Sequence, residues 1–388
     1  MMKKRFGLVF EYMFDIHNER DVAQVSKALS QTTGKALWVY TRNRDYALAD
    51  RTVSYPKGIN ATSKALIQNE LYMSLKPSVF FSLWGGYRSA RDCDAIMVMY
   101  YGIGAFVTAA TFKFFKMLQG KKGIVYSKAD LGSRKIERDE FLLQDSRLKF
   151  VFRFLYHYLM PWAIDYLSVE TAEGKKWLVD KLKRSEDKTF VTYNCPALYP
   201  IEKIKFSDRK KQIIFVGRVS APEKGVKYLI QAFITLVKQH PDYNLIIVGP
   251  YDESWLQSME SHFSISSYPI TLLGNVQSKE KLFQLYSESQ YFVLPSLFEG
   301  SPLSFVEAIC CNVIPVCSDV SFVYKEVLED NAKYCLFDSE DSEHLAEKLS
   351  FLIDNISLSE KIYNGIETIS SNFSWNKQLA SVSKVLSD

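Results

Sequence analysis

Two acidic residues, Glu299 and Glu307, accompany a turn whose backbone could bind an anion. The chain around the first of them runs Ser296-Leu297-Phe298-Glu299-Gly300-Ser301-Pro302-Leu303. Gly300 permits a tight turn and Pro302 suits the first turn of a helix, so the N–H groups within Ser301–Leu303, of which proline has none, should be free to bind an anion. Carboxylates beside such a site can accept hydrogen bonds from sugar hydroxyls, as acidic residues do from ribose in dinucleotide sites.

A purely structural explanation exists for both acids. Glu299 would then interact with the helix dipole, and Glu307 would be a solvated surface charge. Glu307, however, lies between Phe305-Val306 and Ala308-Ile309, and these apolar neighbours make simple solvation a poor explanation. We therefore favour a binding role for both carboxylates.

A second group of candidate residues surrounds the end of another apolar run, Ile213–Val216. Gly217 and Arg218 follow this run directly, and Lys224-Gly225 comes before a helical pattern. Glycine lets a ligand approach the backbone closely, while Arg and Lys supply cations for phosphate oxygens. A helix beginning near Gly225 would add its positive N-terminal end. A Gly-Arg turn at the end of a strand is common, so this pattern alone is a weak indication of phosphate binding.

The elements that must position these residues alternate between strand and helix. Short apolar runs rich in β-branched and aromatic residues predict buried parallel strands, with helical patterns between them. The predicted strands are Phe6–Glu11, Ala36–Thr41, Ala95–Tyr100, Gly123–Ser127, Tyr166–Glu170, Phe190–Tyr193, Gln212–Gly217, Asn244–Gly249, Ile270–Leu273, Tyr291–Pro295, Val313–Cys317 and Lys333–Leu336. The predicted helices include Glu19–Ser30, Val226–Gln239, Lys279–Ser289 and Pro302–Cys311. This alternation predicts an α/β fold with doubly wound parallel sheets.

Chain length and a linker predict two domains. With 388 residues, the chain is longer than one hydrophobic core usually serves. Two prolines and the polar run at residues 207–211 give the segment Pro196–Lys211 the composition of a linker. We expect domains at residues 1–200 and 201–372 and a C-terminal segment, 373–388, with a helix over Asn376–Ser387.

The composition is that of a globular protein. Hydrophobic residues make up 47% and charged residues 24% of the chain, which excludes a disordered protein. The six cysteines show neither C-x-x-C spacing nor histidine partners at metal-ligand spacing, so we expect them to be small buried hydrophobes and expect no zinc. The basic start leads into a short apolar run typical of a strand, and no run of about 20 uncharged apolar residues occurs. These features predict a cytoplasmic protein.

Charge is divided unevenly along the chain. Residues 1–200 hold eleven more basic than acidic side chains, and residues 201–388 hold seven more acidic than basic, for a net charge of +4. Two basic-aromatic stretches, Phe106–Lys122 and Arg147–Trp162, lie in the basic half. Such stretches can lie in the interface of an anionic membrane, or they can be core aromatics with a cationic rim. A peripheral membrane contact is therefore open, and with no recognisable binding module we expect no nucleic-acid partner.

The second half resembles the donor domain of glycosyltransferase family four, the retaining group 1 glycosyltransferases with the GT-B fold. The resemblance covers roughly residues 189–376 and rests on Gly217-Arg218, Lys224-Gly225, Leu245–Gly249, Leu273-Gly274-Asn275-Val276, Pro295-Ser296 and the E-x7-E spacing of Glu299 and Glu307. It implies two Rossmann-like domains whose parallel sheets face each other across a cleft. The first would bind the acceptor and the second the donor, and the last helix would return to the first domain.

The resemblance also implies roles for individual residues. Arg218 and Lys224 would hold the donor diphosphate and stabilise the leaving group. Glu299 would contact the transferred sugar, Glu307 would hold the ribose diol, and the amides of Ser301–Leu303 would meet the diphosphate or the sugar. Gly249-Pro250 and Asn275-Val276 would line the nucleobase slot. Because the cations neutralise the leaving group, such enzymes usually need no metal, so we expect no cofactor beyond the nucleotide diphosphate sugar that serves as donor.

The first half departs from the family pattern. Many relatives have a Gly-Gly pair after the first strand and a histidine after a mid-domain strand. Here the first loop runs Glu11-Tyr12-Met13-Phe14-Asp15-Ile16-His17, and the later position runs Tyr126-Ser127-Lys128-Ala129-Asp130. Asp130 could contact the donor sugar or the attacking hydroxyl as a catalytic residue, or it could cap a turn before Gly132. His17 is better explained as a loop or helix-entry residue than as a base.

These features together predict a hexosyltransferase. It would move a hexose, with retention, from a UDP- or GDP-sugar to a hydroxyl of a bacterial surface glycan or of a lipid-linked precursor at the inner face of the membrane. Two alternatives stay open: a GT-B sugar-nucleotide epimerase, which needs no acceptor, and a catalytically inactive nucleotide-sugar-binding subunit.

Overall fold

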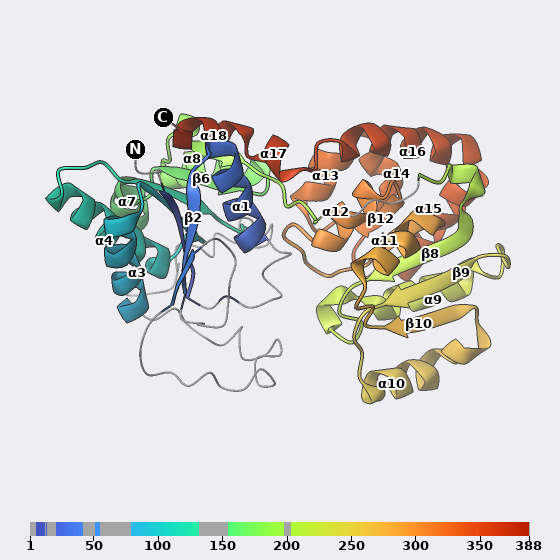
Figure 1. Ribbon diagram of the computed structural model, residues 1–388. Coiled ribbons are helices and arrows are strands. Elements are labelled where there is room, and N and C mark those ends of the chain that lie inside the picture. The colour runs from blue at the N-terminus through green and yellow to red at the C-terminus, as the bar shows by residue number, and fades with distance from the viewer. Residues whose placement is uncertain are drawn as a thin grey trace. The chain divides into compact units, whose positions relative to one another are not determined.

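The chain forms two compact units (Figure 1). The computed structural model describes residues 5–11, 13, 21–41, 51–54, 79–131, 154–197 and 203–387. The first unit takes the described residues up to Tyr193 together with those from Trp375 onward, and the second takes those of Asn194–Ser374. The boundary falls at 193/194, a few residues before the expected 200/201, and Asn194 already donates a hydrogen bond of 3.2 Å to the Ser301 carbonyl of the second unit.

The first unit is built on a seven-stranded parallel sheet in the order β3-β2-β1-β4-β5-β6-β7. Its strands are β1 (Arg5–Val9), β2 (Ala36–Thr41), β3 (Arg51–Ser54), β4 (Ala95–Met99), β5 (Ile124–Lys128), β6 (Tyr166–Val169) and β7 (Thr189–Val191). The accompanying helices and helical turns are α1 (Asp21–Thr33), α3 (Val79–Asp92), α4 (Ile103–Leu118), η4 (Leu155–Leu159), α7 (Met160–Ala163), α8 (Ala172–Leu182) and η5 (Glu186–Lys188). Figure 1 shows α3, α4 and α7 together on one side of this sheet and α1 on the other.

The C-terminal residues belong to the first unit. They form α17 (Trp375–Gln378) and α18 (Ala380–Ser387), so the single helix expected over Asn376–Ser387 is divided at Leu379. Helix α18 packs on α1, where the hydroxyls of Thr32 and Ser383 lie 2.7 Å apart. The ammonium group of Lys35 donates to the carbonyl oxygen of Leu386. The last helix is thereby tied to α1 through side chains and backbone.

The second unit is built on a six-stranded parallel sheet in the order β10-β9-β8-β11-β12-β13. Its strands are β8 (Lys210–Val216), β9 (Asn244–Val248), β10 (Ile270–Gly274), β11 (Ser289–Leu294), β12 (Ile314–Ser318) and β13 (Leu336–Phe337). Its α-helices are α9 (Val226–Leu236), α10 (Glu253–Phe263), α11 (Lys279–Glu288), α12 (Leu303–Cys310), α13 (Phe322–Leu328), α14 (Ala332–Cys335), α15 (Ser342–Asp354) and α16 (Ile356–Ser370). Single turns are η6 (Phe206–Asp208), η7 (Pro222–Lys224), η8 (Ile265–Ser267) and η9 (Glu329–Asn331).

The strand order of the second sheet places two of the candidate loops next to each other. Strand β8 lies between β9 and β11, so the direction in which the chain crosses the sheet reverses beside β8. Open α/β sheets bind ligands at the carboxyl ends of their strands at such a switch point. Because β8 ends at Val216 and β11 at Leu294, the loops beginning with Gly217 and Pro295 emerge there.

The α/β class and the two parallel sheets are confirmed, with two differences in the elements. The strand expected over Lys333–Leu336 is wrong for most of its length, since Ala332–Cys335 is helical and only Leu336 and Phe337 pair with β12. A short apolar run cannot tell a helix from a strand, and pairing with a neighbour decides. Strand β3 was not predicted, because its sequence Arg-Thr-Val-Ser has no apolar run. As the last strand at the sheet edge, it pairs with β2 alone.

Candidate functional site

Backbone contacts join the loops after β8, β9 and β10. The N–H of Gly217 donates to the Val248 carbonyl at 3.0 Å, and the N–H of Gly249 donates to the Gly274 carbonyl at 2.8 Å. Gly249 has φ +136°, and a Cβ placed on it would lie 1.7 Å from the Gly217 carbonyl oxygen. Only glycine fits this position, because both the backbone angle and the close approach exclude a side chain. The residues predicted to line the nucleobase slot come next in the chain: Pro250 follows Gly249, and Asn275 and Val276 follow Gly274.

The loops after β8 and β11 are also in direct contact. The N–H of Leu297 donates to the Glu223 carbonyl at 2.8 Å. Gly225 has φ +61°, and a Cβ on it would lie 2.0 Å from the Pro295 carbonyl oxygen. This second glycine junction holds the residue before it, Lys224, against the loop that carries Glu299.

Lys224 and Glu299 form an ion pair at this edge of the sheet. The Lys224 ammonium donates to Glu299 Oε1, and the Ser296 hydroxyl donates to the same oxygen at 2.7 Å. The two charged side chains are only 15% and 10% exposed. An ion pair so far removed from water is stronger than a surface pair and holds both groups in place. The structure thus brings together two residues that lie 75 positions apart in sequence.

Arg218 takes a different position from Lys224. Its guanidinium bonds Glu223 Oε1 at 2.5 Å, and its side chain is 62% exposed. Sequence reasoning missed Glu223, although an acid directly before Lys224 was visible. An exposed Arg–Glu pair contributes little to stability, so the Arg218 guanidinium can exchange this partner for an anionic ligand.

Glu307 is buried, which excludes the solvated-charge explanation. Its Oε1 lies 3.1 Å from the Lys279 ammonium, and its Oε2 accepts a hydrogen bond of 3.2 Å from the Tyr286 hydroxyl. Burial and the adjacent Glu307 raise the pKa of Tyr286 well above its ordinary value. The phenol therefore stays protonated and donates a hydrogen bond to Glu307. Lys279 and Tyr286 were both missed. Both lie on α11, and the pairing of α11 with α12 is decided by packing.

Replacing Lys279 by methionine is expected to weaken the binding of a nucleoside diphosphate about tenfold, since a charge-assisted hydrogen bond of about 1.5–3 kcal/mol no longer holds Glu307. Isothermal titration with UDP and with GDP measures the effect. Lys281→Met, two residues further along α11 and exposed, is the matched control. Equal dissociation constants for the two variants would contradict a role for Lys279 in holding Glu307.

The turn after Glu299 provides free amides, at positions slightly later than predicted. Helix α12 begins at Leu303, so Pro302 is the N-cap and not the first helical residue, and no side chain caps the helix. The N–H groups of Phe305 and Val306 both point to the Pro302 carbonyl. The amides of Leu303 and Ser304 are left for an external acceptor, since the first turn of a helix cannot satisfy them.

Hydrogen bonds hold the carbonyls of this turn. Asn194 donates to the Ser301 carbonyl at 3.2 Å, and Ser321 donates to the Gly300 carbonyl at 2.5 Å. Because these side chains bond its carbonyl groups, the turn keeps its backbone N–H groups available to a ligand. The predicted residues Gly300, Ser301, Pro302 and Leu303 therefore lie in one fixed turn of the second unit.

Asp130 belongs to the first unit and is exposed, two residues after the end of β5. Behind it lies a buried charge cluster. The Lys128 ammonium is 3.2 Å from Glu170 and 3.4 Å from Asp21. Burial would lower the pKa of Lys128, but the neighbouring carboxylates outweigh it and raise this pKa. Burial, with Asp130 beside it, raises the pKa of Glu170 to about 8 despite Lys128.

Glu170→Gln is expected to flatten the dependence of thermal stability on pH. Folded Glu170 keeps its proton up to about pH 8, whereas the unfolded carboxyl loses it near its ordinary pKa. The folded state therefore binds one more proton between these values, and stability falls as the pH rises through this window. Between pH 6 and pH 8 the free energy of unfolding of the wild type should fall by on the order of 1–2 kcal/mol, and that of the variant should not show this fall. Calorimetric melting curves across this range test it, with exposed Glu173→Gln as control.

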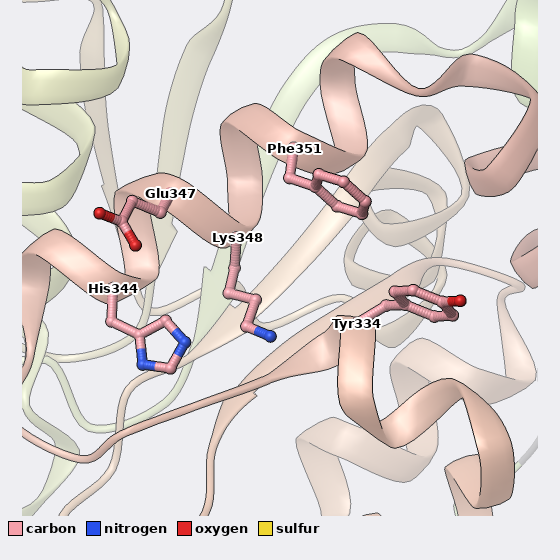
Figure 2. Close-up of a pocket in the computed structure, with 5 residues that line it drawn as sticks. All are labelled: Tyr334, His344, Glu347, Lys348 and Phe351. Atoms are coloured by element: carbon pink, nitrogen blue, oxygen red, sulfur yellow. The ribbon is translucent and has the colours of Figure 1, made fainter.

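A pocket of about 360 Å³ in the second unit lies apart from these residues. Its lining residues are Tyr334, His344, Glu347, Lys348 and Phe351, and Figure 2 shows Lys348 extending from α15 between the others. Lys348 donates to the Lys333 carbonyl at 2.6 Å, and the rings of Tyr334 and Phe351 stack at 6.2 Å. None of the predicted site residues lines this pocket, so it has no part in the site.

The remaining acidic and cysteine side chains have structural explanations, and some predicted features lie outside the described residues. Asp338, Asp341 and His344 lie close together at the start of α15, where Asp341 caps the helix by accepting from the His344 amide at 2.9 Å. All six cysteines are free and five are buried, as expected for small hydrophobes. His17, Gly132 and residues 147–153 lie outside the described residues. No helix in the described parts of the chain is long and apolar enough to cross a membrane.

Comparison with known proteins finds similar sequences for the second half of the chain. Residues 201–368 match the family model of glycosyl transferases group 1. An uncharacterized glycosyltransferase of Methanocaldococcus jannaschii is 24% identical over 227 residues, which cover 56% of this chain and 52% of that protein. The phosphatidyl-myo-inositol mannosyltransferase of Mycobacterium leprae is 28% identical over 176 residues, which cover 45% of this chain and 46% of that protein. The chain thus spans about half the length of the curated relatives it matches.

The fold of the whole chain has a close counterpart among solved structures. The Anabaena protein HepE, solved in complex with UDP and glucose, aligns with a TM-score of 0.65 over 99% of both chains at 12% identity. At that identity the match concerns the fold alone, and it covers both units. Residues 201–368 are thus similar in sequence to the group 1 glycosyltransferases, and the chain has a fold of the GT-B type, with two Rossmann-like units.

Proposed function

We propose that this protein is a retaining hexosyltransferase. It takes a hexose from a UDP- or GDP-sugar and transfers it to a hydroxyl of a bacterial surface glycan or of a lipid-linked precursor. The observation that carries the proposal is the ion pair of Lys224 with Glu299 at the carboxyl edge of the second sheet, where a diphosphate and its sugar would meet. The mannosyltransferase relative and the HepE complex with UDP and glucose support a nucleotide-sugar donor.

The diphosphate would be held by groups of the second unit. Lys224 and Arg218 each have a carboxylate partner without ligand, and a diphosphate would compete with these carboxylates for both cations. The free amides of Leu303 and Ser304 would add uncharged donors at the helix end. As the bond from the anomeric carbon to the diphosphate breaks, negative charge grows on the leaving oxygen. Fixed cations stabilise that charge more than they stabilise bound donor, which lowers the barrier.

The carboxylates would orient the rest of the donor. Once Lys224 turns to the diphosphate, Glu299 would accept hydrogen bonds from hydroxyls of the transferred sugar. Glu307, held on both oxygens by Lys279 and Tyr286, would use its remaining lone pairs for the ribose diol. Pro250, Asn275 and Val276 would contact the base.

Transfer replaces one bond at the anomeric carbon by another. The acceptor oxygen bonds to this carbon as the bond to the diphosphate breaks, and the proton of the acceptor hydroxyl passes to the leaving diphosphate oxygen. We assign Asp130, at the carboxyl edge of the first sheet, to contact with the donor sugar or the attacking hydroxyl. Because Arg218 and Lys224 supply the positive charge, we propose that the reaction needs no metal and no other cofactor.

We further propose that the protein acts in the cytoplasm in peripheral contact with an anionic membrane, where a lipid-linked acceptor would be presented. The excess of basic side chains in residues 1–200 supports this location. No nucleic-acid partner is proposed.

Incubation of the purified protein with a panel of UDP- and GDP-sugars, with and without a bacterial membrane extract, tests the function. Release of nucleotide that depends on the extract is the expected result. An isomerised donor formed without any acceptor would identify an epimerase. Binding of nucleotide with no turnover under any condition would identify an inactive binding subunit.

A further inference from the structure

Three neighbouring helices of the first unit expose large apolar side chains. On α3, Leu83 and Tyr87 are exposed on one stripe while the opposite stripe is buried. On α4, Met117 and Leu118 are 65% and 64% exposed. On η4 and α7, Tyr158 and Trp162, spaced by one helical turn, are 67% and 54% exposed. In the second unit, by contrast, the exposed large apolar side chains Leu273, Phe298, Phe351 and Ile356 lie singly on separate elements.

Contacts join the helices that carry these exposed side chains. The rings of Tyr87 on α3 and Phe115 on α4 are 4.8 Å apart, and Phe115 contacts the exposed Phe114 at 5.4 Å. Lys113 of α4 donates to the Trp162 carbonyl at 2.9 Å, which joins α4 to α7. Figure 1 shows the three helices grouped on the same side of the sheet. We call this surface, made by α3, α4, η4 and α7, the aromatic face.

Basic side chains border the aromatic face where α3 and α4 end. Arg91, Lys121 and Lys122 are exposed there, and the Gln119 amide holds the two helix ends together through the Ala90 carbonyl at 3.3 Å. Residues 79–123 hold six Lys or Arg and two Asp. Exposed Met117 and Leu118 thus lie within a few residues of a cluster of cations.

We propose that the aromatic face docks on the surface of an anionic lipid bilayer. Aromatic side chains with a polar tip are enriched at the membrane interface, and Lys and Arg side chains are attracted to an anionic surface. The cations favour a bilayer over a protein partner, because lysine is depleted at protein interfaces. The proposal names the surface for the membrane contact of the proposed function and does not depend on sugar transfer.

Sedimentation of the full chain with lipid vesicles tests the docking. One set of vesicles is pure phosphatidylcholine, and the other is equal parts phosphatidylcholine and phosphatidylglycerol. The wild type is expected to bind the anionic set, and less strongly as salt is added. Met117→Ser with Leu118→Ser, and separately Lys121→Glu with Lys122→Glu, should each weaken binding about tenfold. Ile356→Ser and Lys361→Glu, exposed positions of α16 in the second unit, are the matched controls and should bind like the wild type.

Several results would overturn the proposal. The proposal is wrong if the wild-type protein stays in solution with anionic vesicles. It is also wrong if the variants in the aromatic face bind these vesicles as well as the control variants do. A dimer in ultracentrifugation without lipid, dissociated by the Met117/Leu118 variant, would assign the face to a second copy of the chain. Titration of every variant with UDP and GDP shows whether the second unit is intact. Since the vesicle assay needs no sugar nucleotide, failure of docking and failure of sugar transfer are separate outcomes.

Discussion

Lys224→Ala is expected to lower the turnover of sugar transfer about a hundredfold to a thousandfold, the usual effect of removing one fixed donor from a developing negative charge. The Gly225 junction holds Lys224 at the switch-point edge, and its ammonium group is paired with Glu299, so the residue lies beside the proposed diphosphate site before any ligand arrives. Steady-state kinetics with the donor found by the panel measure kcat. The effect should fall on kcat more than on KM, because the charge on the leaving group is largest in the transition state.

Two comparisons separate chemistry from folding in this test. Lys238→Ala removes an exposed lysine just beyond the end of α9 and should leave turnover unchanged. The Lys224→Ala protein should melt cooperatively, because Ser296 still bonds Glu299 at 2.7 Å. A well-folded Lys224→Ala protein with wild-type kcat would remove Lys224 from the mechanism and with it the main support for the proposed function.

Gly249→Ala is expected to destabilise the second unit by at least about 3 kcal/mol and to abolish nucleotide binding. A methyl group there would lie 1.7 Å from the Gly217 carbonyl oxygen, on a backbone with φ +136°. The loops after β8 and β9 would have to separate, and they begin with Gly217 and Pro250 of the predicted site. Melting curves and titration with UDP and GDP measure both effects.

Gly274→Ala is the matched control for this substitution. Gly274 also has a positive φ, +62°, but nothing lies within 4 Å of a Cβ placed on it. It should therefore cost only the backbone strain, about 1–2 kcal/mol, and leave nucleotide binding in place. If the two variants were equally stable, close packing of the β8 and β9 loops could not be the reason for glycine at position 249.

Most of the fold, and the positions of the candidate site residues at strand ends, could be predicted because they depend on local patterns. Continuous apolar runs indicated the parallel strands, and β11 is indeed buried along its whole length between β8 and β12. The E-x7-E spacing and the Gly-Arg and Lys-Gly pairs predicted which loops would carry the site, and the structure places the loops after β8 and β11 in contact. Strand β3 escaped prediction because it has no apolar run, and helix α14 because a short apolar run does not distinguish a helix from a strand.

The partners of the site residues lay beyond any local pattern. Glu223 for Arg218, and Lys279 and Tyr286 for Glu307, are neighbours only because η7 and α11 pack where they do. The buried charge cluster likewise brings together three distant elements: Lys128 ends β5, Glu170 follows β6, and Asp21 begins α1. In the basic-aromatic stretch that begins at residue 106, sequence left core and surface undecided, and folding buries Phe112 while it exposes Phe114 and Met117.

Local sequence therefore determined which residue types stand at the strand ends, and hence the kind of ligand proposed for the second unit. Tertiary structure alone decided which charges meet, which side chains leave water and which helical faces stay uncovered. The reason is physical: hydrogen-bonding and apolar patterns repeat over a few residues and can be seen along the chain. Ion pairing and burial depend on distances between segments that only the packed sheets and helices bring together.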